Sequence, residues 1–169
     1  NLNLVHPEVV RAKIRGLDLD KVARRPGISA ILGARVEWLP HQVDVATQAL
    51  DSNPVRKLLA DEVGLGKTVE AALIYAGLRH EGRATRVLVL TPEALCIQWL
   101  GEFYRKTHEL LVLLDEERLS DAAIDFPDLS PFEAHQRIVA SMDTISADES
   151  LMFEATDSEW DLVIVDEAH

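Results

Sequence analysis

From residue 40 onward, short apolar runs alternate with longer segments that have the length of helices. The apolar runs do not alternate polar with apolar positions, which is typical of strands buried on both faces of a parallel sheet. We predict five such strands, at Val55–Ala60, Arg86–Thr91, Leu110–Leu114, Arg137–Ala140 and Leu162–Val165. Because strands that alternate with helices form βαβ units, the pattern predicts an α/β domain whose parallel sheet carries helices on both faces.

The segments between the predicted strands supply the helices. Pro40 can occupy the first turn of a helix that continues to Leu50. Further helices are predicted at Lys67–His80, Pro92–Arg105 and Asp143–Ala155, with a less regular one at Leu119–His135. The acidic stretch Asp115–Pro131 contains Pro127 and Pro131, and of all segments it best fits a long surface loop.

Residues 1–37 differ from the rest of the chain. They mix apolar and basic residues at roughly helical spacing, but Gly16, Pro26 and Gly27 interrupt the pattern. We interpret residues 1–37 as a helical N-terminal extension and residues 38–169 as the main domain. A partly ordered leader is an equally good interpretation of the first segment.

Composition narrows the class of protein. A length of 169 residues fits one domain. No apolar run approaches the ~20 residues that a membrane-spanning helix needs, and the first residues do not show the pattern of a signal peptide. Cys96 is the single cysteine, which excludes an intrachain disulfide and a cysteine-based zinc site; we expect it to be a small buried apolar residue. A cytoplasmic protein is therefore expected.

The charge of the chain is negative and uneven. The net charge is −12, and residues 108–169 hold 17 acidic side chains against 2 basic ones. Residues 1–41, by contrast, hold 7 basic side chains against 4 acidic ones. Affinity for DNA comes largely from neutralising its phosphates. If the protein binds DNA, the contacts must therefore be local, or lie in another part of the protein.

The strongest local signal is the octapeptide DEVGLGKT at residues 61–68, between a predicted strand and an Ala-rich predicted helix. Glycines let the backbone wrap an anion closely, and the amino end of the helix adds a positive dipole. In such a phosphate-binding loop Lys67 would reach the β- and γ-phosphates, and Thr68 would bind Mg²⁺. The general pattern has glycine at the first position, where this chain has Asp61.

A second signal is the tetrapeptide DEAH at residues 166–169, directly after the predicted strand Leu162–Val165. The carboxyl ends of parallel strands face the ligand crevice of an α/β sheet. Asp166 would hold Mg²⁺ through its water shell, and Glu167 would orient and polarise the attacking water. Together with the phosphate loop, these residues supply the groups that ATP hydrolysis with Mg²⁺ requires.

The sequence around these two signals resembles the Swi/Snf family of superfamily-two ATPases. LADEVGLGKTVEA at residues 59–71 is similar to motif I of that family, and there the Asp-Glu before the glycines is the family's own variant. Residues 86–99, 139–142 and 160–169 resemble motifs Ia, Ib and II, and residues 39–42 resemble the adenine-reading segment. The resemblance covers roughly residues 36–169 and implies a RecA-like P-loop NTPase domain.

The resemblance implies roles for individual residues. Catalysis would rest on Glu167, Lys67 and Asp166, and Mg²⁺ would be held by Thr68 and, through water, by Asp166. The nucleotide-binding residues would be Gln42, Glu62, Val63, Gly64, Leu65, Gly66, Lys67, Thr68 and Val69. Thr91, with the amide end of the following helix, and Ser141 would meet DNA phosphates. Gln42 could instead be a solvated helix residue, Thr91 part of an ordinary turn, and Ser141 structural; Trp99 is expected in the core.

The family further implies a function and partners. It implies an ATP-dependent motor that translocates on double-stranded DNA and remodels protein–DNA complexes, with ATP and Mg²⁺ as cofactors. The partner would be RNA polymerase or another DNA-bound protein complex. The family also has a Ser/Thr-rich motif III and a second RecA-like lobe with an arginine finger, which the 169 residues lack. We therefore expect an incomplete first lobe that binds ATP and has little or no turnover by itself.

Two other functions stay open on the sequence. One is a DEAH-type helicase that separates the strands of RNA or DNA, against which the Asp61-Glu62 variant of motif I argues. The other is a nucleotide-dependent binding module that remodels a protein partner with little turnover. Stimulation of ATP hydrolysis by duplex DNA would distinguish these functions from a translocase.

Overall fold

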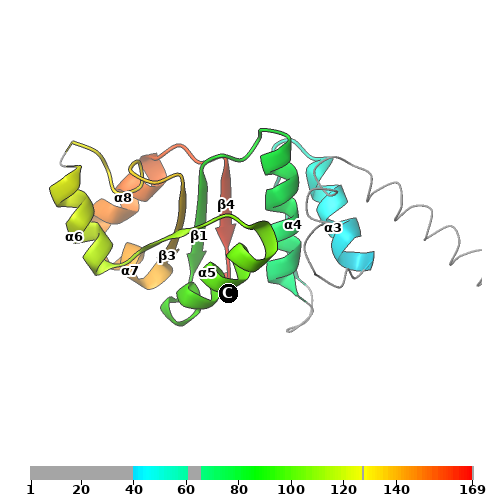
Figure 1. Cartoon of the computed structure of the whole chain (residues 1–169), viewed down its shortest axis with the longest axis horizontal. Coiled ribbons are helices and arrows are strands. Elements are labelled where there is room, and N and C mark those ends of the chain that lie inside the picture. The colour runs from blue at the N-terminus through cyan, green and yellow to red at the C-terminus, as the bar shows by residue number, and fades with distance from the viewer. Residues whose placement is uncertain (1–39, 61–65, 127, 169) are drawn as a thin grey trace, which may run out of the picture. The chain divides into compact units, whose positions relative to one another are not determined.

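The computed structural model describes residues 40–60, 66–126 and 128–168, and the chain divides into two compact units, residues 1–80 and 81–169. In the described part of the first unit, helix α3 (Pro40–Leu50) packs against helix α4 (Lys67–His80) (Figure 1). The helices approach closely at Gly77, where a Cβ atom would lie 2.5 Å from Cδ1 of Leu50. Both helices have their predicted bounds. The predicted extension, residues 1–37, lies outside the described residues.

The strand predicted at Val55–Ala60 is not formed. The chain runs without regular secondary structure from Val55 to Ala60, and the side chain of Leu58 is 81% exposed. None of the strands in the described part of the chain pairs with this segment. A strand is stable only when a neighbouring strand completes its hydrogen-bond ladder. The apolar run alone was therefore an insufficient signal, and the prediction of a strand is wrong here.

The second unit is built on a four-stranded parallel sheet. Its strands are β1 (Val87–Thr91), β2 (Val112–Leu114), β3 (Arg137–Ser141) and β4 (Leu162–Val165), in the order β2-β3-β1-β4. The register places Thr91 beside Ser141 and Leu90 beside Val165. The carboxyl ends of β1, β3 and β4 therefore meet at one edge of the sheet, the edge that faces ligands in parallel α/β folds. The other four predicted strands and their parallel arrangement are confirmed.

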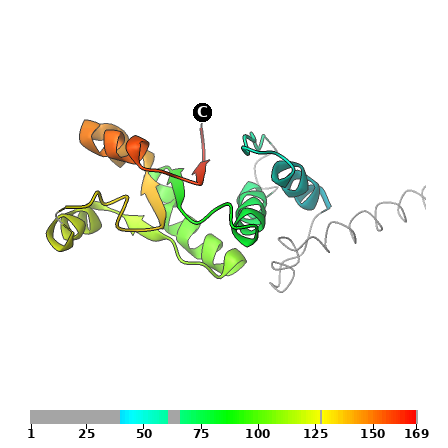
Figure 2. The ribbon, with the colours of Figure 1, turned by 90° about the horizontal axis from the view of Figure 1, so that it is seen from above.

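Helices cover both faces of this sheet, as predicted. On one face, apolar side chains such as Leu88 and Ile138 form a core with α6 (Glu116–Asp125), α7 (Met142–Ala147) and α8 (Glu149–Asp157). On the other face, α5 (Glu93–Thr107) contacts β2 and β3 and buries Cys96, Trp99 and Phe103. Figure 2 shows α5 and α8 on opposite sides of the strands. Successive strand side chains point to opposite faces, so uninterrupted apolar runs suit this two-sided burial.

Carboxylate caps decide where the helices of the acidic region begin. The side chain of Asp115 accepts a hydrogen bond of 2.9 Å from the amide of Arg118, and α6 starts at Glu116, directly after Asp115. The side chain of Asp148 accepts hydrogen bonds from the amides of Ser150 and Leu151, and α8 starts directly after Asp148. Each cap satisfies amides that a helix end leaves unpaired. Three predictions are therefore corrected. The helix predicted at Leu119–His135 spans Glu116–Asp125, so these residues are not part of the loop predicted at Asp115–Pro131. Residues 143–155 lie in two helices rather than one.

Asp161 and Arg86 form hydrogen bonds at the amino-terminal ends of β4 and β1. Oδ2 of Asp161 accepts hydrogen bonds from the backbone amides of Thr85, at 2.8 Å, and Arg86, at 2.9 Å. These two bonds, that of Arg86 first, hold the pKa of Asp161 below its usual value. The Arg86 side chain donates to the carbonyls of Glu159 and Phe132 and lies over the Trp160 ring. Three segments distant in sequence are thereby joined at the start of β1.

Cys96 is buried in helix α5, as the sequence analysis expected. Its side chain is 4% exposed, and its Sγ lies 3.8 Å from the carbonyl oxygen of Pro92. Burial, and then the negative charge of Glu93, raise the pKa of the Cys96 thiol. A buried thiol of raised pKa has little thiolate and low reactivity, so Cys96 acts as a packing residue.

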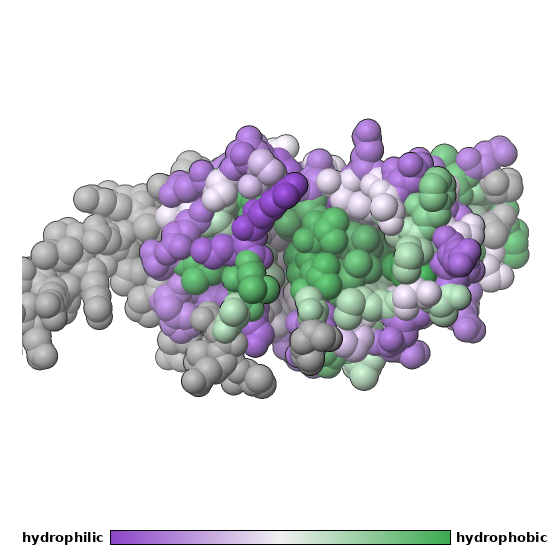
Figure 3. Space-filling model, turned by 180° about the vertical axis from the view of Figure 1, so that it is seen from behind, coloured by the Kyte–Doolittle hydropathy of each residue, from purple (hydrophilic) through white to green (hydrophobic). Residues whose placement is uncertain are grey.

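An apolar hollow lies on the α7–α8 side of the sheet. It has a volume of about 500 Å³ and is lined by residues including Leu88, Leu90, Met152 and Val163. Figure 3 shows an apolar patch on this side of the molecule. Val163 is 47% and Val165 48% exposed, so the apolar face of the edge strand β4 is incompletely covered by these helices. Within the described residues, every helix is too short or too polar to cross a membrane.

Candidate functional site

The end of the predicted phosphate loop lies in the first unit. Glu62, Val63, Gly64 and Leu65 are outside the described residues. Gly66 has φ 87°, a left-handed conformation that glycine adopts without steric cost. Its carbonyl oxygen accepts hydrogen bonds from the amides of Val69, at 2.7 Å, and Glu70, at 3.2 Å. Gly66 therefore begins helix α4, as the glycine before Lys67 in a phosphate-binding loop should.

The structure brings Gln42 against this glycine. The side chain of Gln42 is 3% exposed, so it is not a solvated helix residue. A Cβ atom on Gly66 would lie 2.6 Å from Nε2 of Gln42, closer than van der Waals contact allows. The residue predicted to read adenine thus touches the loop predicted to bind phosphate, although 24 positions separate them in the sequence.

Lys67, Thr68 and Val69 occupy the first turn of α4, and all three are half-buried. The first amides of a helix have no intrahelical acceptor, and the helix dipole favours negative charge at this end. Lys67 adds a full positive charge to the same turn. The local chemistry of this turn suits a phosphate group with a bound divalent cation.

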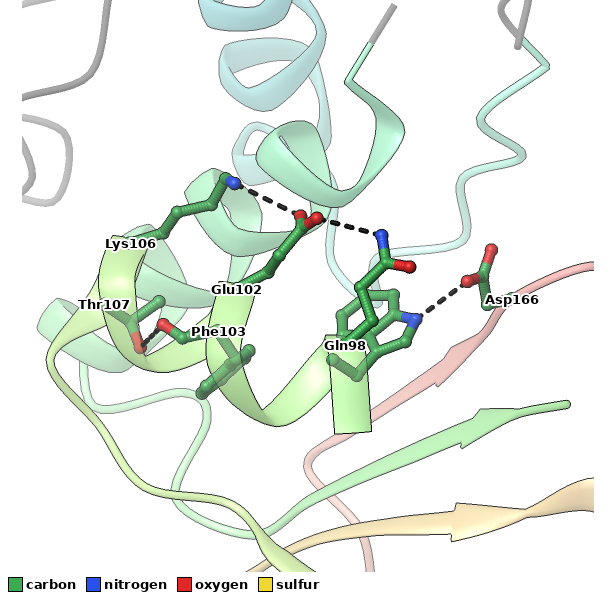
Figure 4. A network of polar contacts seen from close by, with 7 residues as sticks. Gln98, Glu102, Phe103, Lys106, Thr107 and Asp166 are labelled. Carbon is green, nitrogen blue, oxygen red and sulfur yellow. Dashed lines mark hydrogen bonds and ion pairs between the residues drawn. The ribbon is translucent and has the colours of Figure 1, made fainter. Parts of the chain in front are cut away.

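In the second unit, the Asp166 carboxylate is held by two donors at the end of β4. The indole Nε1–H of Trp99 donates to Oδ2 at 2.7 Å, and the amide of Glu167 donates to Oδ1 at 3.0 Å (Figure 4). The amide of Asp166 itself donates to the carbonyl of Leu90 at 2.8 Å, which continues the ladder between β4 and β1. Backbone and side chain of Asp166 are thus both fixed, while the residue remains half-buried.

Glu167 is exposed and has an unusual backbone conformation. Its φ is 52°, in the left-handed region that few residues other than glycine adopt. Such conformations cost free energy and cluster at functional sites. The bend at Glu167 follows closely after the carboxyl end of β4. This geometry leaves the carboxylate accessible to a ligand at that edge.

Thr91 and Ser141 lie side by side at the ends of β1 and β3, but their side chains are buried. Thr91 is 0% exposed, and its hydroxyl has no hydrogen-bond partner among the described residues. Ser141 is 4% exposed, and its hydroxyl accepts a hydrogen bond of 3.3 Å from the amide of Thr144, which caps α7. In this conformation neither hydroxyl faces the surface. The groups next to them that could meet a phosphate are the first backbone amides of α5.

The residues at the end of β4 fit Mg²⁺ better than a metal with an all-protein cage. Across residues 40–60, 66–126 and 128–168, no three His, Cys, Asp or Glu side chains lie close enough together to hold a metal. Mg²⁺ keeps most of its waters and is commonly bound by one or two carboxylates together with phosphate oxygens. The carboxylate of Asp166 has about four lone-pair sites, and two hydrogen bonds leave room for ordered water.

The bond between Trp99 and Asp166 is the feature that sequence reasoning missed. Trp99 was expected in the core, and at 4% exposure it is. The polar partner of its indole could not be found from local pattern, because the two residues are 67 positions apart. The one available signal was general: a buried tryptophan N–H nearly always has a hydrogen-bond acceptor.

The chain is similar in sequence to known proteins. The sequence profile of the SNF2-related domain matches residues 36–169. The RNA polymerase-associated proteins RapA of Sodalis glossinidius and Yersinia enterocolitica are each 40% identical to the chain over 141 residues, which is 83% of the chain. The chain spans 14% of the length of these curated relatives.

A solved structure shares the fold. The SWI2/SNF2 ATPase core of Sulfolobus solfataricus in complex with double-stranded DNA superposes with a TM-score of 0.61 at 21% identity. The match covers 80% of this chain and 27% of that one. The RecA-like α/β fold is therefore confirmed.

Proposed function

The chain belongs to the SNF2-related family, and from this premise we propose that it forms the ATP-binding lobe of a motor that translocates on double-stranded DNA. The complete motor would hydrolyse ATP and use the free energy to remodel protein–DNA complexes. The observation that carries the proposal is the match to the family over residues 36–169, which includes both the phosphate loop and the Asp166-Glu167 pair.

Each proposed catalytic group has a task suited to its position. Lys67, at the start of α4, would bind the β- and γ-phosphates, and the first amides of that helix would bind phosphate oxygens. Thr68 and Asp166 would hold Mg²⁺, which when bound neutralises the developing phosphate charge. Glu167 would orient the attacking water and accept its proton. Gln42 would hydrogen-bond the adenine edge.

The contact with DNA would be made by the main chain beside Thr91 and Ser141. Both hydroxyls are buried, whereas α5 begins at Glu93, immediately after β1 and Pro92. The first amides of a helix bind phosphate without a side chain, and the dipole of a 15-residue helix adds to the attraction. The remainder of the DNA contact would come from parts of the protein outside these 169 residues.

The name of the relatives suggests which protein–DNA complex the motor would remodel. The RapA proteins of Sodalis glossinidius and Yersinia enterocolitica are named as RNA polymerase-associated. At 40% identity over 141 residues, an association of this protein with RNA polymerase is part of the proposal. Another DNA-bound protein complex is the alternative partner, and co-purification of the complete protein with core polymerase distinguishes the two.

The test is the ATPase activity of the complete protein with no nucleic acid, with single strands and with blunt duplex DNA. We expect strong stimulation by the duplex and no separation of its strands. Lys67→Ala should abolish the activity, and the exposed Lys57→Ala should leave it intact. Unwinding of a forked duplex would instead identify a strand-separating helicase. Nucleotide binding without stimulation by any nucleic acid would identify a protein-binding module.

A further inference from the structure

We propose that Trp99 is a positioning residue that orients the Asp166 carboxylate for Mg²⁺. This inference rests on the proposed ATPase function, because it assigns to Asp166 the role of holding Mg²⁺. Trp99 itself touches neither nucleotide nor metal. It would act through a single hydrogen bond, from its indole Nε1–H to Oδ2 of Asp166.

The bond has the geometry of a strong interaction. Its length of 2.7 Å is at the short end for an N–H donor and is typical of a hydrogen bond to a charged oxygen. Trp99 is 4% exposed, so its N–H has little access to water and depends on Asp166 for an acceptor. Indole has one donor, so the bond selects one orientation of the carboxylate.

The position of the Trp99 donor is fixed by helix α5. Trp99 lies in the middle of α5, and its side chain is buried. On the neighbouring face of the helix, Glu102 accepts hydrogen bonds from Gln98, at 3.0 Å, and Lys106, at 3.2 Å (Figure 4). Such pairs spaced by four residues stabilise a helix. A buried aromatic ring on a stabilised helix loses little conformational entropy when it holds a partner.

The fixed orientation matters because, within the part of the chain that the structure describes, the Asp166 carboxylate has one other hydrogen bond, from the amide of the following residue at 3.0 Å. That bond forms within the turn at Glu167, whose φ of 52° is unfavourable for glutamate. Without the indole, the carboxylate could rotate away from the direction in which the metal's water shell is bound. Partners that orient metal-binding carboxylates typically contribute 10- to 100-fold to metal affinity or activity.

The experiment measures Mg²⁺-dependent binding of a fluorescent ADP analogue to the complete protein. We expect Trp99→Phe, which keeps an aromatic ring and removes the donor, to raise the Mg²⁺ concentration required for half-maximal tightening by about tenfold. Binding of the nucleotide in excess EDTA should stay unchanged. In ATPase assays the half-saturating Mg²⁺ concentration should rise in parallel, and kcat at saturating Mg²⁺ should be largely retained.

Trp160→Phe is the matched control. Its indole donates to the carbonyl of Ala155 at 2.8 Å, so the substitution removes the same kind of buried bond. Trp160 packs on the α7–α8 face of the sheet, whereas Trp99 belongs to α5, on the opposite face. Trp160→Phe should therefore lower the melting temperature without changing the Mg²⁺ dependence. If Trp99→Phe fails to fold, 3-benzothienylalanine at position 99 replaces the N–H by sulfur in a ring of the same shape.

A double variant tests whether Trp99 changes the Mg²⁺ dependence through Asp166. If Trp99 acts through Asp166, the Mg²⁺ dependence of Asp166→Asn should not change further when Trp99→Phe is added. Equal Mg²⁺ dependence of wild type and Trp99→Phe, or additive effects in the double variant, would overturn the positioning role. Failure of the wild type to bind the ADP analogue at any Mg²⁺ concentration would contradict the proposed nucleotide site instead.

Discussion

The side-chain amide of Gln42 occupies the space that a Cβ atom on Gly66 would fill, with Nε2 2.6 Å from that position. The glycine is therefore required twice, for its φ of 87° and for its missing side chain. Because Nε2 is the far end of a flexible side chain, an alanine would displace the amide rather than unfold the helix pair. Substitution of Gly66 by alanine should therefore weaken nucleotide binding more than it lowers the stability of the fold.

We accordingly predict that Gly66→Ala weakens ADP binding by roughly tenfold or more, about the value of one lost hydrogen bond. Calorimetric titration with MgADP measures this change. Gly82→Ala is the control, since Gly82 has φ 72° and, apart from its chain neighbours, no described residue lies within 4 Å of the added Cβ. Both variants should lose about 1–2 kcal/mol from left-handed strain. Equal nucleotide affinity in Gly66→Ala and wild type would show that Gln42 and Gly66 do not form part of the site.

Glu167→Gln should separate binding from turnover. The substitution keeps the size of the side chain and removes the negative charge that would polarise water. Turnover in the complete protein should fall by roughly 10²-fold or more, in the range of general-base losses, while ATP still binds. Single-turnover hydrolysis alongside a binding assay measures both quantities. The exposed Glu159→Gln, at the opposite end of β4, provides a control for loss of a surface charge away from the site. Near-normal turnover of Glu167→Gln would remove Glu167 from the mechanism.

The Asp161 carboxylate should stabilise the folded protein at neutral pH and lose this effect in acid. Its pKa in the folded protein lies below the usual value of 3.8, because the amides of Arg86 and Thr85 favour the charged carboxylate. The native state therefore binds the proton less readily than the unfolded state. This stabilisation is complete above the unfolded pKa and is lost as the pH falls through the lower folded pKa.

Asp161→Asn should consequently reduce the melting temperature at neutral pH by an amount that stays constant down to about pH 5. The difference from wild type should shrink below pH 3.8, because the carboxylate is protonated first in the unfolded state and only at lower pH in the folded protein. Thermal denaturation of both proteins across that pH range provides the measurement. A difference that grew toward acid pH would have the wrong sign and would contradict the assignment.

DNA binding by residues 1–169 alone should be weak at physiological salt. Residues 108–169 carry 17 acidic side chains against 2 basic ones, and the proposed contact consists of a few backbone amides near Thr91 and Ser141. The logarithm of affinity falls with the logarithm of salt concentration by about 0.9 per neutralised phosphate. Titration of labelled duplex at two salt concentrations should therefore yield a shallow slope for this segment and a steeper one for the complete protein. Submicromolar binding by the segment would instead implicate its basic residues 11–25 in DNA binding.

Secondary structure followed from the sequence where local signals were sufficient. Lys67–His80 and Leu162–Val165 have their predicted bounds because helix formers and a compact apolar run define them. The prediction was wrong about the extent of α6, which begins after the Asp115 cap, and about the break near Asp148, where another aspartate side chain caps a helix in an acidic stretch. At Val55–Ala60 it failed because strand formation depends on a neighbour, which a local pattern does not contain.

The chemical groups of the candidate site, and their places at strand and helix ends, could be read from the sequence by itself. Lys67 opens a helix and Asp166 follows a strand because those local elements are encoded next to the motifs. Tertiary structure alone decided that Trp99 binds Asp166 and that the hydroxyls of Thr91 and Ser141 are buried. These features depend on how α5 packs across strands that are distant in the chain. Periodicity shows that a helix face is buried, but not which acceptor will meet a donor on it.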